Sequence, residues 1–201
     1  VTAPSAPSTP DLDSSSDTGS SNSDNVTSDL TPTFTGTAEA NSSVELFLDG
    51  SSLGTTTTDG SGNWTFTTGS NLSYGAYSIT ATATDGAGNT SVASSGLSIN
   101  LDQSIMDNRL SLDTAIALWI SDKSNANSIY GDINTWDVSA ISDFSNLFEN
   151  KTTFNSDISS WDVSNGTNFT SMFEDAREFN QDIGNWDVSN STTFQGMFRS
   201  A

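Results

Sequence analysis

The C-terminal part of this 201-residue chain repeats one pattern three times. The sequence Asp-Ile-x-x-Trp-Asp-Val-Ser begins at Asp132, at Asp157 and at Asp182, so the copies are 25 residues apart. The same spacing relates three further sets of apolar residues: Phe144, Phe169 and Phe194; Leu147, Met172 and Met197; Phe148, Phe173 and Phe198. A fixed period of this length is typical of units that stack, because one unit cannot bury its own apolar side. We therefore predict a solenoid over residues 103–201.

Each repeat has two apolar segments. The first, Ile-x-x-Trp-x-Val, has leucine-rich-repeat spacing and predicts a short strand on which Trp and Val point the same way. The second has apolar residues at i, i+3 and i+4, which predicts one or two helical turns behind the strand. The three Trp residues are then core residues and not a row for stacking sugars.

The Asp between Trp and Val faces outward in this arrangement. Asp137, Asp162 and Asp187 would form a ligand-facing ladder on the repeat strand, about 4.8 Å apart, and such a ladder is repulsive unless it is compensated. A bound cation or cationic ligand is one compensation, and hydrogen bonds from backbone N–H groups between coils are another. The sequence leaves both open, as it does for the Asp residues that begin each repeat.

A helix is predicted before the first repeat. Ser111 is a suitable N-cap for residues 112–120, in which Leu112, Ile116, Trp119 and Ile120 share one face. We expect this helix to cover the first coil as an N-terminal cap. The chain stops at Ala201 in the middle of a repeat, so we expect the solenoid to be truncated there.

The repeat also resembles a known family. Phe179 to Asn190, Phe-Asn-x-Asp-Ile-x-x-Trp-Asp-Val-Ser-Asn with a following Met-Phe, is similar to the BspA-type leucine-rich repeats of bacterial surface proteins. The resemblance spans roughly residues 110–201. It implies an extracellular or cell-surface protein that binds a ligand, and it does not imply an enzyme.

The first half of the chain has a different pattern. Residues 1–10 are rich in Pro and predict a linker, and residues 11–31 would be disordered if taken alone. Beyond them, short Thr-rich segments alternate with turn sequences, which predicts an antiparallel β-sandwich over residues 11–102. The predicted strands are 33–38, 44–48, 52–56, 64–67, 76–83 and 96–101. The predicted core consists of Phe34, Val44, Leu46, Leu48, Trp64, Phe66, Tyr77, Ile79, Leu97 and Ile99.

The motifs of this half are Asp17-Thr18-Gly19, Ser23–Thr27, Thr31–Glu39, Gly62-Asn63-Trp64 and Ala83–Asn89. They resemble the bacterial immunoglobulin-like repeats of large secreted adhesins, and the resemblance spans roughly residues 10–101. It implies domains joined in tandem as stalks that Ca²⁺ often stiffens at their junctions. The fold class expected for the whole chain is therefore mixed, with an all-β immunoglobulin-like sandwich followed by a short α/β leucine-rich-repeat-type solenoid with an N-terminal helical cap.

Two acidic groups in the sandwich are candidate Ca²⁺ ligands, because this hard cation prefers several converging oxygens from flexible loops. If the first strand enters the sandwich near Asp11, the turn that holds Glu39 and the turn that holds Asp85 and Asn89 lie at the same end of the sandwich as Asp11. The first group comprises Asp11, Asp13, Glu39, Asp85 and Asn89. The second, expected at the other end, comprises Asp17, Asn22, Asp24 and Asp29. The alternative is that these residues form turns on a solvated acidic surface.

Composition excludes several functions. With 25 acidic residues, 5 basic residues and a net charge of −20, the chain is not suited to nucleic acids or anionic membranes. It contains no Cys and no His, which removes thiol chemistry and the commonest general base and transition-metal ligand. No carboxylate pair stands out as an acid and base, and no Ser has a base to activate it. We expect no enzyme.

These observations predict a segment of a secreted or surface-anchored bacterial adhesin. The sandwich would be a spacer beside tandem neighbouring domains, and the repeats would bind an extracellular protein or glycan. No segment is apolar enough for membrane insertion. Two alternatives stay open: a cell-wall or filament component that self-associates through its repeats, and a non-catalytic module of a polysaccharide-active enzyme.

Overall fold

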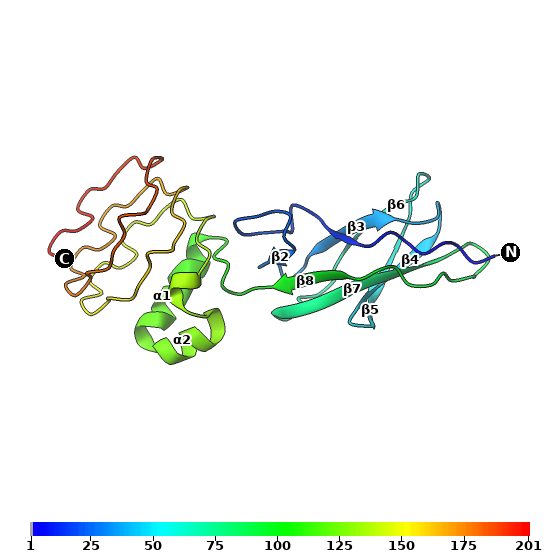
Figure 1. The fold of residues 1–201 in the computed structure, drawn as a ribbon, viewed down its shortest axis with the longest axis horizontal. Coiled ribbons are helices and arrows are strands. Elements are labelled where there is room, and N and C mark those ends of the chain that lie inside the picture. Colours follow the sequence, from blue (N-terminus) through cyan, green and yellow to red (C-terminus); the bar gives the residue numbers. More distant parts are fainter. Residues whose placement is uncertain (1) are drawn as a thin grey trace. The chain divides into compact units, whose positions relative to one another are not determined.

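The chain folds into two compact units, one ending at Asp102 and the other spanning Gln103–Ala201. The computed structural model describes residues 2–201 (Figure 1). Among these residues, no helix has both the length and the apolar character that a membrane crossing requires.

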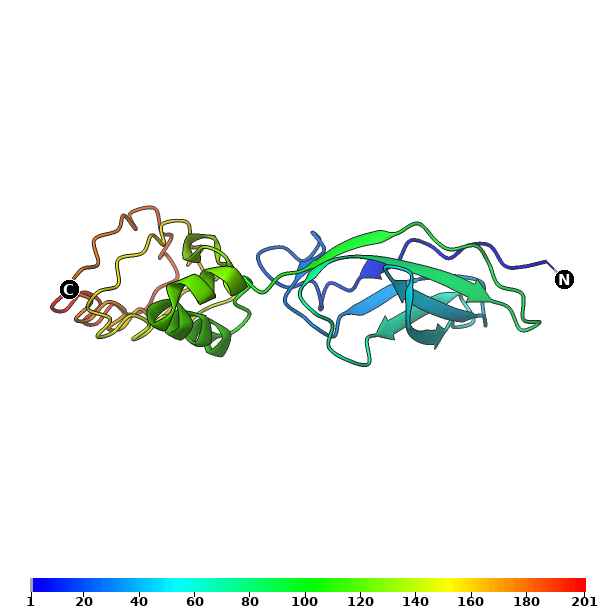
Figure 2. The same cartoon turned by 90° about the horizontal axis from the view of Figure 1, so that it is seen from below.

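The first unit is a sandwich of two β-sheets (Figure 2). One sheet has the order β1 (Asp11–Leu12), β3 (Thr33–Thr37), β6 (Asn63–Thr67). The other has the order β2 (Val26–Thr27), β8 (Leu97–Leu101), β7 (Gly75–Thr84), β4 (Ser43–Leu48), β5 (Ser51–Thr57). The six strands predicted between residues 33 and 101 all form, with each end within one residue of its predicted position.

Alternating apolar residues from the two sheets meet in one core. Phe34 and Trp64 come from the three-stranded sheet, while Leu46, Ile79 and Ile99 come from the five-stranded sheet, and all five are buried. Four predicted core residues lie at the margin and are only partly buried: Leu48, Phe66, Tyr77 and Leu97. The prediction missed Leu12, Ala81, Ala83 and Leu101, which are fully part of the core.

The segment predicted to be disordered in isolation connects the two sheets. After β1 pairs with β3, the chain crosses to the other sheet, where β2 pairs with β8 in parallel, with Val26 opposite Asn100. The prediction of a purely antiparallel sandwich was therefore wrong, because the β2–β8 pair is parallel. Thr27 is fully buried, and this burial ties the crossing segment to the core.

The predicted linker is also part of the sandwich. Pro4, Pro7 and Pro10 are buried while the residues between them are exposed. A three-residue period is that of a polyproline II helix, which places every third residue on one side. The Ser8 N–H donates to the Thr37 carbonyl at 2.9 Å, and the Thr37 N–H donates to the Ser8 hydroxyl at 2.9 Å, so this stretch extends the line of β1 along β3.

The second unit begins with α1 (Arg109–Ser121) and α2 (Lys123–Tyr130), followed by a 3₁₀ turn, η1 (Ile133–Thr135). The N-cap of α1 is Asn108 and not Ser111 as predicted. The Asn108 carboxamide oxygen accepts the Ser111 N–H at 2.9 Å, and the Ser111 hydroxyl accepts the Asn108 N–H in return. The helix therefore starts three residues earlier than predicted, and Ile120 on the predicted apolar face is 40% exposed.

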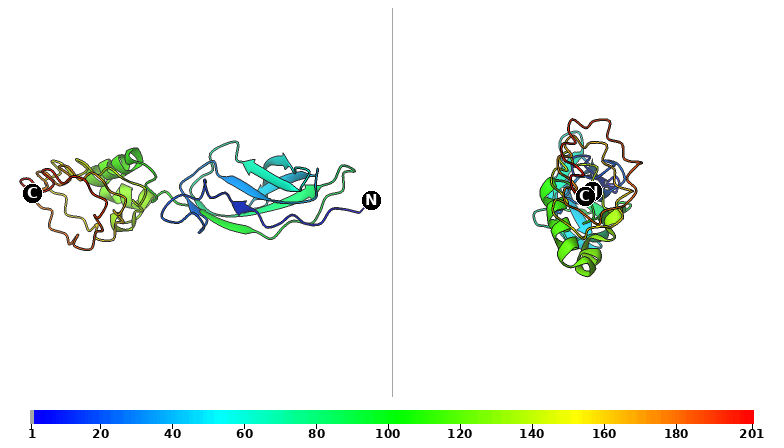
Figure 3. Two further views of the ribbon diagram at one scale, coloured as in Figure 1. Left: turned by 90° about the horizontal axis from the view of Figure 1, so that it is seen from above. Right: turned by 90° about the vertical axis from the view of Figure 1, so that its left-hand side faces the viewer.

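The three repeats form turns of the chain that lie one over another (Figure 3). Single parallel bridges join Asp143 to Asn168 and Asn168 to Thr193. The strand predicted at Ile-x-x-Trp-x-Val does not form. The structure describes all of residues 138–201, and β-pairing in this range is limited to isolated single-residue bridges.

The helical turns predicted at Phe144–Phe148 and its copies are also absent, because the backbone there makes consecutive β-turns. Asn146 and Asn150 have φ of 57° and 59°, a left-handed conformation that an α-helix excludes. The Phe144 N–H donates along the stack to the Asn168 carbonyl at 2.8 Å, while the Leu147 N–H closes a turn on the Phe144 carbonyl at 3.4 Å. A turn repeated every four residues places apolar side chains at nearly helical spacing, and for this reason the sequence pattern predicted a helix.

Aromatic stacking joins the coils. The Phe144 and Phe169 rings stack with centroids 5.2 Å apart, and Phe173 stacks on Phe198 at 5.4 Å. The Trp161 indole N–H donates to the Ile133 carbonyl of the preceding coil at 2.7 Å. Each coil is thus attached to its neighbour by ring contacts and by hydrogen bonds that repeat with the sequence period.

Arg109, at the start of α1, covers two carbonyls at the edge of the first coil. Its Nη1 donates to the Asp143 carbonyl at 2.9 Å and its Nη2 to the Ser145 carbonyl at 2.8 Å. Between later coils, the equivalent carbonyls accept backbone N–H groups. The guanidinium therefore takes the place that a preceding coil would occupy, and Asp113 holds it there through a 2.7 Å ion pair.

We expect Arg109→Ala to lower the free energy of unfolding of the second unit by about 2 kcal/mol, because two carbonyls lose charged donors. Chemical denaturation followed by Trp fluorescence measures the change. Arg177→Ala is the matched control, since its side chain is 69% exposed and its one ion pair among residues 2–201 is with the neighbouring Asp175. The control should change stability by less than about 0.5 kcal/mol. Equal effects of the two substitutions would contradict the assigned role of Arg109.

Candidate functional site

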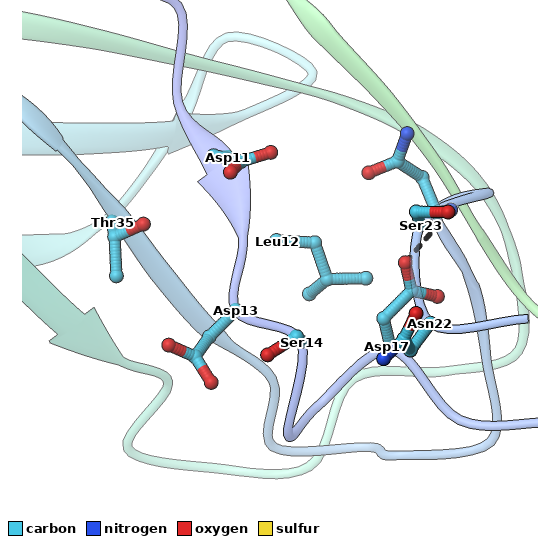
Figure 4. Close-up of a pocket in the computed structure, with 9 residues that line it drawn as sticks. Asp11, Leu12, Asp13, Ser14, Asp17, Asn22, Ser23 and Thr35 are labelled. Atoms are coloured by element: carbon cyan, nitrogen blue, oxygen red, sulfur yellow. Dashed lines mark hydrogen bonds between the residues drawn. The ribbon is translucent and has the colours of Figure 1, made fainter.

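The sandwich contains an acidic pocket of about 290 Å³ beside β1. Its walls are β1, the loop that follows it and one residue of β3 (Figure 4). The residues that line it are Asp11, Leu12, Asp13, Ser14, Asp17, Asn22, Ser23, Asn25 and Thr35. The pocket thus gathers carboxylate, amide and hydroxyl oxygens around the single apolar side chain of Leu12.

Asp17 is the most unusual residue in this pocket. It is only 4% exposed. Its Oδ2 accepts the Asn25 N–H at 3.1 Å, but its Oδ1 is buried and has no hydrogen-bond donor among residues 2–201. Burial raises the pKa of Asp17, and the negative charges of Asp24 and Asp11 raise it further. A buried charge without a compensating donor is costly, and this oxygen is the one buried carboxylate oxygen without a donor in the described part of the sandwich.

Local turn chemistry gives the loop this shape. The Asp13 carbonyl accepts the N–H groups of Ser16 and Asp17 at 2.8 and 3.0 Å, which turns the chain back beneath β1. The Asp13 carboxylate accepts the Ser15 hydroxyl at 2.6 Å and the Ser15 N–H at 3.0 Å, and these bonds lower the pKa of Asp13. Figure 4 shows Asp17 and Asn22 on one side of Leu12 and Asp13 on the other. Asp13 therefore serves the turn more than the pocket.

The structure mixes the two ligand groups predicted from the sequence. Asp11, Asp13, Asp17 and Asn22 line one pocket, although the sequence assigned them to opposite ends of the sandwich. Asp24 lies close enough to Asp17 to affect its pKa, and its Oδ1 accepts the Val26 N–H at 3.0 Å. Asp29 accepts the Ser16 hydroxyl at 2.8 Å.

Glu39, Asp85 and Asn89 do not join Asp11 and Asp13. Asp11 lies opposite Thr35 in the middle of β3, whereas Glu39 follows the far end of that strand. The chain enters this far end with residues 4–8, not with Asp11, so the assumption behind the first predicted group was wrong.

Asp85 belongs to a turn of its own. Its carboxylate accepts the Asn89 side-chain amide at 2.8 Å and the backbone N–H groups of Ala87 and Asn89 at 2.9 Å. These bonds lower the pKa of Asp85, with the Asn89 side chain contributing most.

Within residues 2–201, no group of three or more acidic side chains is arranged to hold a metal ion on its own. A cation in the pocket would therefore need Asn22, hydroxyl or water oxygens beside Asp17 and Asp11. The Ca²⁺ site stays a prediction.

The Asp residues of the repeats act on their own backbone. Oδ1 of Asp137, Asp162 and Asp187 accepts the N–H two residues ahead, at 2.9, 3.0 and 2.9 Å. The Asp residues that begin each repeat do the same: Asp132, Asp157 and Asp182. The backbone N–H bonds to these carboxylates therefore run within each coil, and not between coils as one of the two alternatives expected. Asp157 in addition accepts the Asn134 side-chain amide of the preceding coil at 3.2 Å. Backbone and hydroxyl donors of Ser159 and Ser189 lower the pKa values of Asp157 and Asp187.

Comparison with known families agrees with the sandwich. Residues 3–103, half of the chain, match the family model of the bacterial Ig-like domain. The chain belongs to the bacterial Ig-like domain family. The expected resemblance to bacterial immunoglobulin-like repeats is thereby confirmed for the first unit.

Residues 120–201 match a family described as a Mycoplasma protein of unknown function, DUF285, which fits the expected BspA-type repeats loosely. None of the curated proteins matches significantly. Among solved structures, the chain is similar to the crystal structure of Bacteroides uniformis beta-glucuronidase, with 25% identity and a TM-score of 0.27. That match covers 44% of this chain and 10% of the other, and it has no bearing on function.

We expect Asp17→Asn to stabilise the Ig-like domain by about 1 kcal/mol at neutral pH in the presence of a chelator. Because the pKa of Asp17 is raised in the folded state, the domain loses stability as the pH rises from the ordinary pKa of Asp to the raised value. Above the raised value the loss is complete. The amide is neutral, keeps an acceptor for Asn25 and turns a donor toward its acidic neighbours. Differential scanning calorimetry measures the change.

Asp85→Asn is the control of opposite sign. The pKa of Asp85 is lowered, so its ionised form stabilises the fold above its ordinary pKa, and that stability is lost as pH falls through the lowered value. This substitution should reduce stability at neutral pH. A destabilised Asp17→Asn variant would show that the charge of Asp17 is already compensated.

Proposed function

We propose that the chain is a non-catalytic segment of a secreted or surface-anchored bacterial adhesin. The Ig-like domain serves as a spacer, and the repeats present a binding surface for an extracellular protein or glycan. The observation that supports this most strongly is the repeat stack, in which the side chains that recur at the surface are polar and each Asp is engaged with its own turn. Such a surface binds by complementarity and makes or breaks no bond. Both matching families are consistent with a surface protein.

In this proposal the second unit is a leucine-rich-repeat-type solenoid that α1 and α2 cap at its N-terminal side. Three observations support the cap. Arg109 donates to two carbonyls at the edge of the first coil. Trp119 of α1 packs edge-on against Trp136, with centroids 5.6 Å apart. One continuous apolar core runs from the helix into all three coils.

Calcium binding in the acidic pocket is the second part of the proposal. Ca²⁺ prefers six to eight oxygen ligands in a flexible arrangement. The unpartnered Asp17 Oδ1 fits this preference, because a cation supplies the compensation that no protein donor provides. All five basic residues follow residue 108, so the Ig-like domain has no cation of its own to do this. Asp17, Asp11 and Asn22 would hold the ion, and the ion would fasten the loop after β1 to the sandwich.

Addition of Ca²⁺ should raise the melting temperature of the Ig-like domain. When the free ion is at a hundred times its dissociation constant, the free energy of unfolding should rise by about 2.7 kcal/mol. Asp17→Asn should abolish this response, while Asp85→Asn should keep it. Calorimetry in chelator and in Ca²⁺ measures both variants beside the native chain. The site is refuted if Asp17→Asn responds to Ca²⁺ as the native chain does.

The binding role predicts that the chain is monomeric and captures an extracellular ligand. Light scattering over a range of concentrations gives the molar mass, and immobilised glycans and extracellular-matrix proteins serve as probes for capture. Growth of the scattering mass with concentration, without capture of any probe, would favour a wall or filament component instead.

A further inference from the structure

The second unit has a pocket of about 340 Å³ between its two helices and a loop of the repeats. Trp119 and Ile120 at the end of α1 and Lys123 at the start of α2 form one side, and residues 153–156 form the other. Trp119 and Phe154 are each only 3% exposed, whereas Ile120 is 40% exposed. The pocket therefore has two buried rings at its base and one apolar side chain at its rim.

The base of this pocket is held in place by contacts within the protein. The Trp119 indole N–H donates to the Ser156 hydroxyl at 2.9 Å, which ties α1 to the loop. The Phe154 ring stacks on Phe148 with centroids 3.9 Å apart. The pocket is thus formed before a ligand arrives, as small-molecule sites usually are.

Lys123 brings a positive charge to the pocket. Its ammonium lies 4.8 Å from the centroid of the Trp119 ring, within cation–π range. Each Arg of the chain is ion-paired, but Lys123 has no ion pair among residues 2–201, although the chain has 25 acidic residues. The neighbouring Asp122 carboxylate instead accepts the Asn125 N–H at 3.1 Å. The ammonium is therefore available to an anion from outside the chain.

The opposite side of the pocket offers hydrogen-bond donors. The Asn155 carboxamide oxygen accepts the Asn180 N–H at 2.9 Å and the Gln181 side-chain amide at 2.8 Å. The NH₂ group of Asn155 and the hydroxyl of Thr153 have no partner among residues 2–201. The Ser156 hydroxyl already accepts an indole N–H, so its proton is left to donate. One cationic and three neutral donors thus surround the pocket.

We propose that this pocket binds an acidic sugar, a single pyranose ring that carries a carboxylate. The proposal rests on the proposed binding role of the second unit and names the class of ligand. The carboxylate would pair with Lys123, which gives a charge-assisted hydrogen bond. Oxygens of the ring would accept from Thr153 and Asn155, and the apolar face of the ring would pack against Ile120.

Charge favours a carboxylate over a phosphate. One ammonium matches the single charge of a carboxylate, whereas a phosphate dianion would keep an uncompensated charge beside a chain of net charge −20. The repulsion from the rest of the chain is screened beyond about 8 Å at physiological ionic strength. Contacts inside the pocket therefore decide binding.

The shape of the pocket favours a sugar over an acidic peptide. An extended peptide binds through main-chain hydrogen bonds to the edge of a strand, and the residues that line this pocket lie in helices and a loop. An Asp or Glu side chain alone would also leave much of the 340 Å³ unfilled, whereas a pyranose ring reaches both sides.

The test titrates the full chain with methyl galacturonide and follows the Trp119 indole N–H by NMR, because this group lies at the base of the pocket. Lys123→Gln should weaken binding at least about 10-fold, as expected for the loss of a charge-assisted hydrogen bond. Lys123→Arg should keep most of the affinity. The methyl ester of the same sugar, which is uncharged, should bind the native chain no more tightly than the acid binds Lys123→Gln.

Lys151→Gln is the matched control. It removes the same charge from the other lysine, which does not line the pocket, and should change the affinity by less than about 2-fold because exposed charges are screened. Chemical denaturation followed by Trp fluorescence reports that the second unit stays folded in each variant.

Four results would overturn the proposal. The Trp119 signal does not respond to the sugar, the two lysine variants weaken binding equally, or the methyl ester binds as tightly as the acid. The fourth is tighter binding of N-acetylglutamate amide than of the sugar, because the pocket would then take an acidic peptide. If Lys123→Gln still captures immobilised glycans or matrix proteins while it binds methyl galacturonide as the native chain does, this site is refuted and the binding role of the repeats stands.

Discussion

The second unit depends on one backbone device, the alternation of N–H directions through consecutive turns. In residues 144–151 and 169–176, alternate N–H groups close turns within the coil or donate to the next coil. The alternation requires a left-handed residue in every turn, and the repeats place Asn146, Ser171 and Gly196 at one such position and Asn150, Asp175 and Ser200 at the other. Each interface then has four hydrogen bonds of this kind, each contributing about 1 kcal/mol, and stacked Phe rings add about 0.5–1.5 kcal/mol per pair. Stability is therefore a property of neighbouring coils and not of a single coil.

Many acidic residues in both units stabilise turns, because their carboxylates accept hydrogen bonds from nearby backbone and side-chain donors. Asp13, Asp59, Asp85, Asp157 and Asp187 all have lowered pKa values because backbone or side-chain donors of nearby residues bond to them. Their charges are compensated locally by the turns that they stabilise, so the chain folds with few basic residues. Asp17 is the exception, since one of its oxygens is buried without a donor. An acidic surface of this kind is thus mostly turn chemistry, with one site where the compensation is incomplete.

The sequence predicted the sandwich closely and the repeats only in period. Strand positions followed from alternating residues and Gly or Asx turns, which are local signals. The helix prediction for the repeats was wrong because a four-residue turn period and the 3.6-residue helical period both bring Phe144 and Phe148 to the same side of the chain. The Asn residues at 146 and 150 were the sequence signal for left-handed turns. The acidic pocket was divided wrongly because sequence alone did not show that Pro4, Pro7 and Pro10 are buried along β3, which moves Asp11 to the middle of that strand. Asp17 was among the predicted ligands, but its burial depends on tertiary contacts that no local pattern reveals.

The way the chain enters and leaves the Ig-like domain has a mechanical consequence. Ser8 lies beside Thr37 at one end of the sandwich, and Leu101 lies beside Gly75 and Thr27 at the other. A pull between these points runs along the strands and strains the β1–β3 and β2–β8 pairs in shear. Hydrogen bonds under shear share the tension and rupture together, whereas bonds that are peeled break one after another. The order of the strands thus suits a domain that must transmit force along its chain without unravelling.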